Sequence, residues 1–267
     1  MRSRIGFQAV FLAVLCAAVL AVAQEYTLHE KLGVSVSATT VNQFDGTHLV
    51  IWHLNPPENW HLYSDRLNDT GFPPALTLHW PEAWSAGPLL WPVAERHVMT
   101  GGILDHVYPG PVTLLQEVRV PAESLAEGDV ALAARWDWLV CREICVPGNT
   151  PAEVVFSSSE SSPLALALLA DVRSELPVPA PAGYLKHAWT ETAVTLSAGD
   201  AVRMEFHPDT DCVRLVDAIA DGARDGDTLT LRLRPAPATH GPLRGVLHLK
   251  RSDGCTENWS VDIPYGG

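Results

Sequence analysis

The stretch DVALAARWDWLVCREICVPGN, residues 129–149, decides the expected fold of this chain. Its first part alternates in polarity, and with a period of two Trp136 and Trp138 share one face of a β-strand. Cys141 falls on the opposite, more polar face, at the end of the apolar run. A short turn must then bring Cys145 back before the Val-Pro-Gly break. The stretch therefore predicts a core strand that ends in a closely spaced cysteine pair.

Short apolar runs of the same kind recur along the chain, separated by Pro, Gly and Asn. No long amphipathic helix interrupts the runs that surround the cysteine pair. Segments of this length with turn signals between them favour antiparallel sandwiches over βαβ units. The sequence therefore predicts an all-β protein with two β-sandwich domains. The expected strands lie at residues 48–54, 75–80, 112–120, 129–140, 152–156, 193–196, 202–206, 227–234, 244–250 and 258–263.

The composition changes between the two sets of runs. A Ser-rich stretch leads into one helix-like segment, in which Ser162 is the expected N-cap and Pro163 the first helical residue. Pro177 ends this segment, and the prolines that follow favour an extended connector. We therefore expect a first domain over residues 24–158, a linker over 159–183 and a second domain over 184–267.

The first 23 residues have the features of a secretory signal peptide. Arg2 and Arg4 precede an apolar run, and the run ends in a small-residue pattern that predicts cleavage after Ala23. The run is too short for a typical membrane span, and no later stretch approaches that length. Acylation at Cys16 is an alternative that the bulky Leu15 before it disfavours. We expect an exported protein with no membrane span after cleavage.

Charge and cysteine content narrow the expected function. The chain has 18 Lys and Arg against 31 Asp and Glu, and loss of Arg2 and Arg4 with the signal changes the net charge from −13 to −15. This balance disfavours nucleic acid and anionic lipid as partners. Four cysteines remain, an even number that suits an oxidising compartment.

Spacing alone leaves the role of the Cys141/Cys145 pair open. A disulfide across so short a loop contributes roughly 2 kcal/mol on the chain-entropy model, which makes it a weak staple. An exposed or strained bond would suit a redox couple that forms and breaks. Arg142 would favour a thiolate and Glu143 would oppose it. A metal site would need further soft ligands nearby.

The residues around the pair resemble a known family. WLVCREICVPG (138–148) is similar to the active-site strand and turn of the periplasmic N-terminal domain of DsbD-type thiol:disulfide interchange proteins. Other landmarks of that domain follow the same order, and the resemblance covers about residues 30–156 and extends weakly over 184–263. The matching stretches are NWHLYSD (59–65), GFPPALTLHWPEAW (71–84), LLWPVAER (89–96) and VYPGPVTLLQEV (107–118).

The resemblance implies immunoglobulin-like sandwiches and a redox-active disulfide, with no other cofactor. Cys141 and Cys145 would be the catalytic pair, and Cys145 would receive electrons first. Electrons would come from a membrane thiol transporter or a thioredoxin-like donor and pass to oxidised periplasmic proteins. The chain ends at Gly267 without the family's membrane and thioredoxin-like domains, so the donor is expected to be a separate protein. The cysteine spacing is also shorter than in the best-known members.

The resemblance also implies a cap over the cysteines. The matching segment, residues 95–107, contains Gly101 and Gly102, which would allow a mobile loop. Tyr63 matches one of two family tyrosines beside the cysteines, and His61 replaces the other. The expected neighbours of the pair are His61, Tyr63, Glu95, His97, Met99 and Glu143.

Two rival readings rest on other residues. Cys212 and Cys255, 43 positions apart, are expected to form a structural disulfide, which would contribute about 4 kcal/mol; an exported binding module would use both pairs structurally. A copper-handling periplasmic protein would bind the metal through its cysteines, and His97, Met99 and His106 form a second candidate cluster, because sulfur and imidazole suit copper. We assign no metal site, and no hydrolase or phosphate-binding motif is present.

Overall fold

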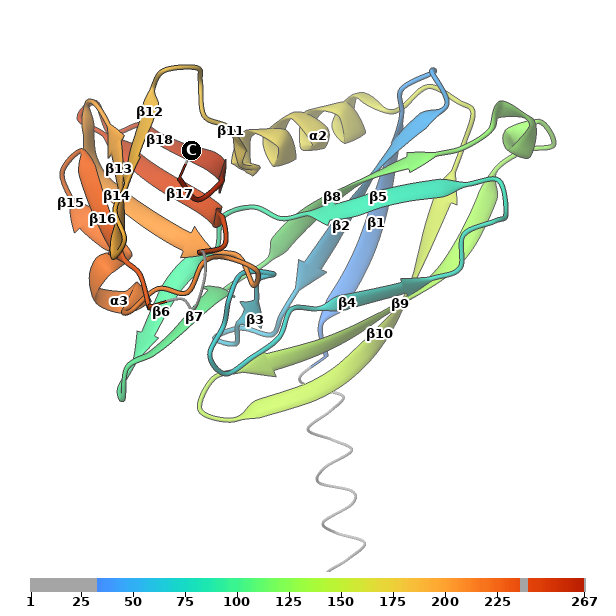
Figure 1. Cartoon of the computed structure of the whole chain (residues 1–267). Helices are drawn as coiled ribbons and strands as arrows, with labels where there is room; N and C mark the ends of the chain where they lie inside the picture. The colour runs from blue at the N-terminus through green and yellow to red at the C-terminus, as the bar shows by residue number, and fades with distance from the viewer. Residues whose placement is uncertain (1–32, 236–239, 267) are drawn as a thin grey trace, which may run out of the picture.

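The computed structural model describes residues 33–235 and 240–266. Within these ranges the chain forms two β-sandwiches joined by one α-helix (Figure 1), which confirms the predicted all-β fold. The predicted signal peptide and its cleavage after Ala23 lie outside the described residues. None of the helices in the described part is long and apolar enough to cross a membrane.

The first sandwich packs a four-stranded sheet against a three-stranded sheet. Its core is rich in tryptophan, and Trp52 meets Trp136 edge to face across the two sheets, with ring centroids 5.5 Å apart. Trp136 and Trp138 are buried in this core, as the period-two pattern predicts. The four-stranded sheet contains, in spatial order, β1 (Ser35–Asn42), β2 (Thr47–Asn55), β8 (Val112–Arg119) and β5 (Ser85–Leu90). The three-stranded sheet contains β10 (Cys145–Phe156), β9 (Val130–Cys141) and β4 (Ala75–Leu78).

A third, small sheet covers the end of β9 that carries the cysteine. Leu139 and Cys141 lie on the face opposite the tryptophans, but this face is buried against Tyr63 and Val107. The expectation that Cys141 emerges on a polar face is therefore wrong, because strands distant in sequence cover it. The sheet contains β3 (Leu62–Tyr63), β7 (Ile103–Tyr108) and β6 (Glu95–Met99).

The linker helix α2 (Pro163–Glu175) packs on the outer face of the four-stranded sheet. The Ser162 side chain accepts a hydrogen bond from the Ala165 N–H at 3.1 Å, which confirms the predicted N-cap. Leu169 lies in the same cluster as Ile51 of β2, so β2 is covered on both faces. Beyond the helix, β11 (Val178–Pro179) pairs with the second sandwich. The linker thus contacts both sandwiches, and the proposed domain boundaries stay predictions.

The second sandwich has its own core. In β16 (Thr228–Arg232) Leu229 and Leu231 are buried while Thr228 and Thr230 are exposed, which confirms the predicted alternation. One sheet contains β11, β18 (Thr256–Ile263), β17 (Leu243–Arg251), β14 (Ala201–Pro208) and β15 (Ala223–Asp225), and the other β12 (Leu185–Trp189), β13 (Ala193–Ala198) and β16.

The predicted Cys212–Cys255 disulfide is wrong, since both thiols are free. Cys212 follows β14 in a turn that pairs with the start of β17, whereas Cys255 lies in the turn after the end of β17. A strand of nine residues spans about 27 Å, far beyond the Cα separation that a disulfide allows. The spacing in sequence gave no sign that β17 runs between the two cysteines.

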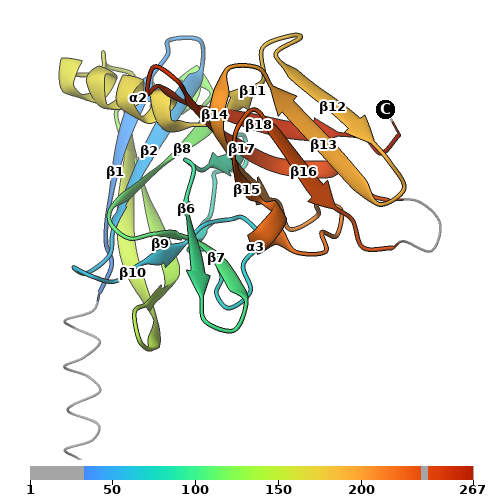
Figure 2. The same ribbon diagram turned by 90° about the vertical axis from the view of Figure 1, so that its left-hand side faces the viewer.

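The second sandwich contacts the hairpin formed by β6 and β7 (Figure 2). We call this hairpin the cap hairpin. The guanidinium of Arg96 in β6 donates to the Ala218 carbonyl at 2.7 Å, and more weakly to those of Phe206 and Ile219. These groups belong to β14 and the short helix α3 (Ala218–Asp221). The cap hairpin therefore belongs to the first domain by sequence and is anchored to the second by contact.

Two buried histidines complete this interface and predict sensitivity to acid. His106 of β7 packs against His207 of β14, with ring centroids 5.0 Å apart. Burial lowers the pKa of His106 to about 4, and burial likewise lowers the pKa of His207. The unfolded chain therefore binds protons more readily, so the contribution to stability is complete above about pH 6.5 and disappears as the pH falls toward 4.

We expect His106 alone to remove about 3 kcal/mol of unfolding free energy over that pH window. Urea unfolding at pH 7 and at steps down to pH 4 measures the loss. The variant His106→Gln keeps a donor for the Leu67 carbonyl, which His106 Nδ1 contacts at 2.8 Å, but does not titrate. A pH profile as steep in this variant as in the wild type would contradict the prediction.

Candidate redox site

The site is built at the tip of the β9–β10 hairpin. Cys141 and Cys145 are directly paired across the hairpin and form a disulfide, with their Cα atoms 4.1 Å apart. The Arg142 N–H donates to the Ile144 carbonyl at 3.1 Å, which closes the tight turn between them. Cys145 is exposed, whereas Cys141 is only 3% exposed. An incoming thiol can therefore reach one end of the bond more easily than the other.

The buried cysteine is fixed by backbone hydrogen bonds. The Cys141 N–H donates to the His61 carbonyl at 3.1 Å, and the His61 N–H donates back at 3.0 Å. This bridge joins β9 to the segment that leads into β3. It places Tyr63, two residues further on, beside the sulfur atoms.

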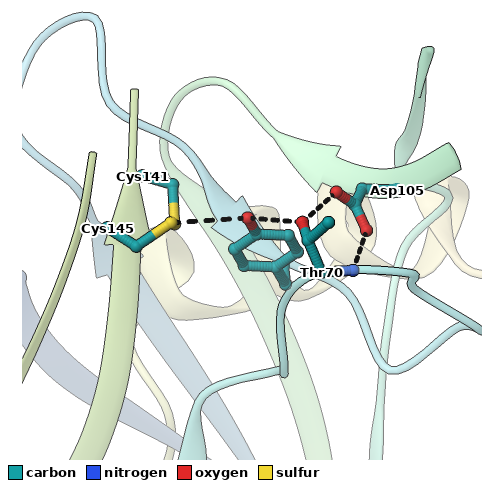
Figure 3. Close-up of a disulfide and its surroundings, with 5 residues drawn as sticks. Thr70, Asp105, Cys141 and Cys145 are labelled. Carbon is teal, nitrogen blue, oxygen red and sulfur yellow. Dashed lines mark hydrogen bonds between the residues drawn. A yellow bond between two sulfur atoms is a disulfide. The ribbon is translucent and has the colours of Figure 1, made fainter. Parts of the chain in front are cut away.

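A hydrogen-bonded chain runs from the exposed cysteine into the protein (Figure 3). The Tyr63 hydroxyl lies 3.9 Å from Cys145 Sγ and 3.4 Å from Thr70 Oγ1. Thr70 Oγ1 donates to Asp105 Oδ2 at 2.5 Å, and the Thr70 N–H donates to Asp105 Oδ1 at 3.0 Å. Asp105 of β7 is fully buried. The disulfide is thus connected to a buried carboxylate through two hydroxyl groups.

The loop that follows β3 holds this chain in place. It runs alongside β7, where the Ser64 N–H donates to the His106 carbonyl and the Asn68 side chain accepts from the His106 N–H. Gly71 lies directly against the Tyr63 ring, since a Cβ at Gly71 would be 2.1 Å from Tyr63 Cζ. The close approach of the loop requires this glycine and keeps the phenol ring in position.

Burial sets the protonation of the two aromatic neighbours. Burial raises the pKa of Tyr63, and the Asp105 carboxylate adds to this effect, so the hydroxyl keeps its proton at neutral pH. Burial lowers the pKa of His61, and the adjacent His97 adds to this effect, so His61 is neutral there. The Arg142 guanidinium lies over the Trp60 ring, 5.7 Å from its centroid.

The structure gathers some of the predicted neighbours and separates others. His61 packs against both Tyr63 and His97, with ring centroids 5.3 and 5.5 Å apart. Glu143 is exposed in the turn between the cysteines. Glu95 begins β6, where it borders the cleft between the sandwiches, and Met99 ends β6 opposite Ile103. The cap segment is thus a β-hairpin, with Gly101 and Gly102 at positive φ in its turn.

The residues considered for copper do not converge. His97 packs against His61, whereas His106 packs against His207 in the second sandwich. Within residues 33–235 and 240–266 no group of three or more His, Cys, Asp or Glu side chains is arranged to hold a metal ion.

Sequence reasoning missed Thr70, Asp105 and Arg96. Thr70 lies in a polar loop that gives no signal of its own. Asp105 gives a weak signal in the sequence, because it is an acidic residue within the apolar run ILDHVY. Buried charges need a partner, so a charge inside an expected strand indicates a specific contact but not its identity.

Fold and site together define a class: an immunoglobulin-like sandwich with an accessible disulfide at the tip of one hairpin. Residues 32–157 match the family described as "Thiol:disulfide interchange protein DsbD, N-terminal". This part of the chain is therefore a DsbD-type N-terminal domain, a thiol:disulfide interchange domain. The predicted family resemblance is confirmed.

Comparison with solved structures extends the match to both sandwiches. The N-terminal periplasmic domain of ScsB from Proteus mirabilis aligns with a TM-score of 0.54 and 14% identity, covering 86% of this chain and 92% of that one. At this identity the likeness concerns the fold. The major pilin subunit BcpA*(D312A) of Bacillus cereus aligns with a TM-score of only 0.26 and 8% identity, covering 88% of this chain and 67% of that one. We infer nothing about this chain from that alignment. No curated protein matches the sequence significantly.

Proposed function

We propose that this protein relays reducing equivalents between thiol proteins in the periplasm through the Cys141/Cys145 pair. The observation that carries the proposal is the disulfide itself, with one exposed and one buried cysteine in a DsbD-type domain. The signal-like N-terminus supports export, and the family supports the periplasm as the compartment. A membrane thiol transporter or a separate thioredoxin-like protein is the proposed donor, and oxidised periplasmic proteins are the proposed acceptors.

The proposed reaction consists of two thiol–disulfide exchanges. A donor thiolate attacks Cys145 Sγ, the bond to Cys141 breaks, and Cys141 leaves as a thiolate that takes up a proton. The second thiol of the donor then attacks the donor's first sulfur, which is bonded to Cys145 in the mixed disulfide, and Cys145 is released. The donor is oxidised to a disulfide and this protein gains two electrons and two protons. With an oxidised acceptor Cys145 attacks, Cys141 resolves the mixed disulfide, and the electrons are passed on.

The cap hairpin fits this proposal as a shield. His97 packs on His61, next to the disulfide, while the neighbouring Arg96 is anchored to α3 of the second sandwich. Neighbouring residues of β6 thus contact the redox site and the second sandwich. A partner that reaches the buried Cys141 would have to move this hairpin against its anchor, whereas the exposed Cys145 is accessible without that movement.

The reduction potential of the pair tests the proposal. We expect equilibration with a thiol buffer to give a potential less negative than about −300 mV, together with rapid reduction by a thioredoxin-like donor. A structural disulfide would give a potential below that value and resist the donor. Alkylation of freed thiols followed by mass spectrometry gives the reduced fraction, with Cys212 and Cys255 as thiols that stay free throughout.

A further inference from the structure

Asp105 orients the hydroxyl group of Thr70. Both oxygens of this buried carboxylate accept hydrogen bonds from Thr70, one from its N–H at 3.0 Å and one from its hydroxyl at 2.5 Å. An ionised carboxylate only accepts, and a threonine hydroxyl has a single proton. The Thr70 proton is therefore committed to Asp105, and Thr70 Oγ1 can only accept from its other neighbour.

That neighbour is Tyr63. Its hydroxyl lies 3.4 Å from Thr70 Oγ1 and 3.9 Å from Cys145 Sγ. Because Thr70 has no proton left to give, Tyr63 donates to Thr70 and turns an oxygen lone pair toward the sulfur. All donors in the chain then point in one direction, toward Asp105.

We propose that Asp105 is a positioning residue: acting through Thr70, it holds the hydroxyl proton of Tyr63 away from Cys145, so that reduced Cys145 rests as a thiol. The Cys145 S–H then donates to Tyr63, and the thiolate lacks the donor that would stabilise it. Because the thiolate is the attacking species, the reduced pair would be protected from unspecific oxidation. This inference rests on the proposed function, since it concerns the reduced form of the same pair.

Other charged or titratable groups surround the pair. They come from the hairpin turn, from the segment leading into β3 and from the cap hairpin. These charged or titratable groups are Arg142, Glu143, His61 and His97. A change at Asp105 must therefore be shown to act through Tyr63 and not by a direct electrostatic effect on the cysteines.

Substitutions at the inner end of the chain should reverse its direction. In Asp105→Asn the Thr70 N–H keeps the amide oxygen on its side, so the amide nitrogen faces Thr70 Oγ1 and donates to it. Thr70 can then donate to Tyr63, and Tyr63 can donate to Cys145. Thr70→Val has the same outcome by a different route, because valine cannot accept the Tyr63 proton.

The reactivity of Cys145 measures this reversal. The full chain, reduced with dithiothreitol, is treated with limiting iodoacetamide at pH 7. Tryptic cleavage after Arg142 separates the two cysteines, so mass spectrometry follows each one. We expect Asp105→Asn and Thr70→Val each to raise the alkylation rate of Cys145 about fivefold, the effect of one hydrogen bond to a thiolate. Thr70→Ser, which keeps the hydroxyl, should restore the wild-type rate.

A double variant separates relay from direct charge. In a Tyr63→Phe background Asp105→Asn should have no further effect, because the connecting hydroxyl is gone. A rise that persists there, or no rise in either single variant, would overturn the inference. Faster alkylation of the buried Cys141 and the half-buried Cys212 as well would indicate general loosening and also overturn it. If Asp105→Asn does not fold, the Thr70 variants decide.

The test needs no protein partner, because a chemical reductant supplies the electrons. Failure of the relay itself would appear in the reduction potential and in the reaction with a thioredoxin-like donor. Failure of the positioning inference would leave both unchanged and appear only in the Cys145 alkylation rate. The two outcomes are therefore distinguishable.

Discussion

A Cys141→Ser variant is expected to form mixed disulfides readily, whereas Cys145→Ser is expected to form them at least about ten times more slowly. The physical reason is access: Cys145 is exposed, while Cys141 is 3% exposed beneath the small sheet. Neither variant can close the internal disulfide, so neither completes a relay cycle. The measurement uses a thioredoxin-like protein that lacks its resolving cysteine and carries its remaining cysteine as a mixed disulfide with thionitrobenzoate. The variant's thiolate attacks this cysteine and releases the coloured thionitrobenzoate anion, so the rate of colour development gives the rate of mixed-disulfide formation.

The free thiols require a control in this experiment. Cys255 is exposed and would react by itself, so both variants are made in a chain with Cys212→Ser and Cys255→Ser. Equal rates for Cys141→Ser and Cys145→Ser would show that access does not choose the attacked sulfur. Failure of both variants to trap any thiol partner would count against the relay itself.

Trp136→Ala is expected to lower the free energy of unfolding by about 3–5 kcal/mol. Trp136 is fully buried and packs edge to face on Trp52, so it joins the two sheets of the first sandwich. Its removal leaves a cavity at the centre of the core, which costs contacts as well as transfer free energy. Urea unfolding followed by far-UV circular dichroism measures the loss.

Two matched variants show whether the loss comes from burial. Trp136→Phe keeps an aromatic ring in the core and should lose much less stability. Phe44→Ala removes an aromatic side chain that is 66% exposed, and it should change the unfolding free energy by less than about 0.5 kcal/mol. A Trp136→Ala loss no greater than that of Phe44→Ala would contradict the assignment of this core.

Local patterns predicted the elements well, because they depend on neighbouring residues. Alternation in residues 129–140 and 227–234 placed the buried faces of β9 and β16 correctly. The helix after Ser162 begins where its capping side chain and Pro163 indicate. In each case the information is a period or a cap, and both are written within a few residues of the feature.

Contacts between distant segments were not predictable in this way. The expected Cys212–Cys255 bond failed because β17 separates the two thiols, and the expected polar face at Cys141 failed because β3 and β7 cover it. Arg96 gave no sign of its contacts with the second sandwich.

The sequence alone determined the all-β class, the helix in the linker and, by resemblance, the redox pair with His61 and Tyr63 near it. Only the tertiary structure decided that Cys145 is the exposed partner and that Thr70 and Asp105 complete a chain behind Tyr63. The physical reason is that strand pattern and turn chemistry are local properties. Burial of a particular sulfur or carboxylate depends instead on which strands pair, and here β3 and β7 meet β9 from distant parts of the chain.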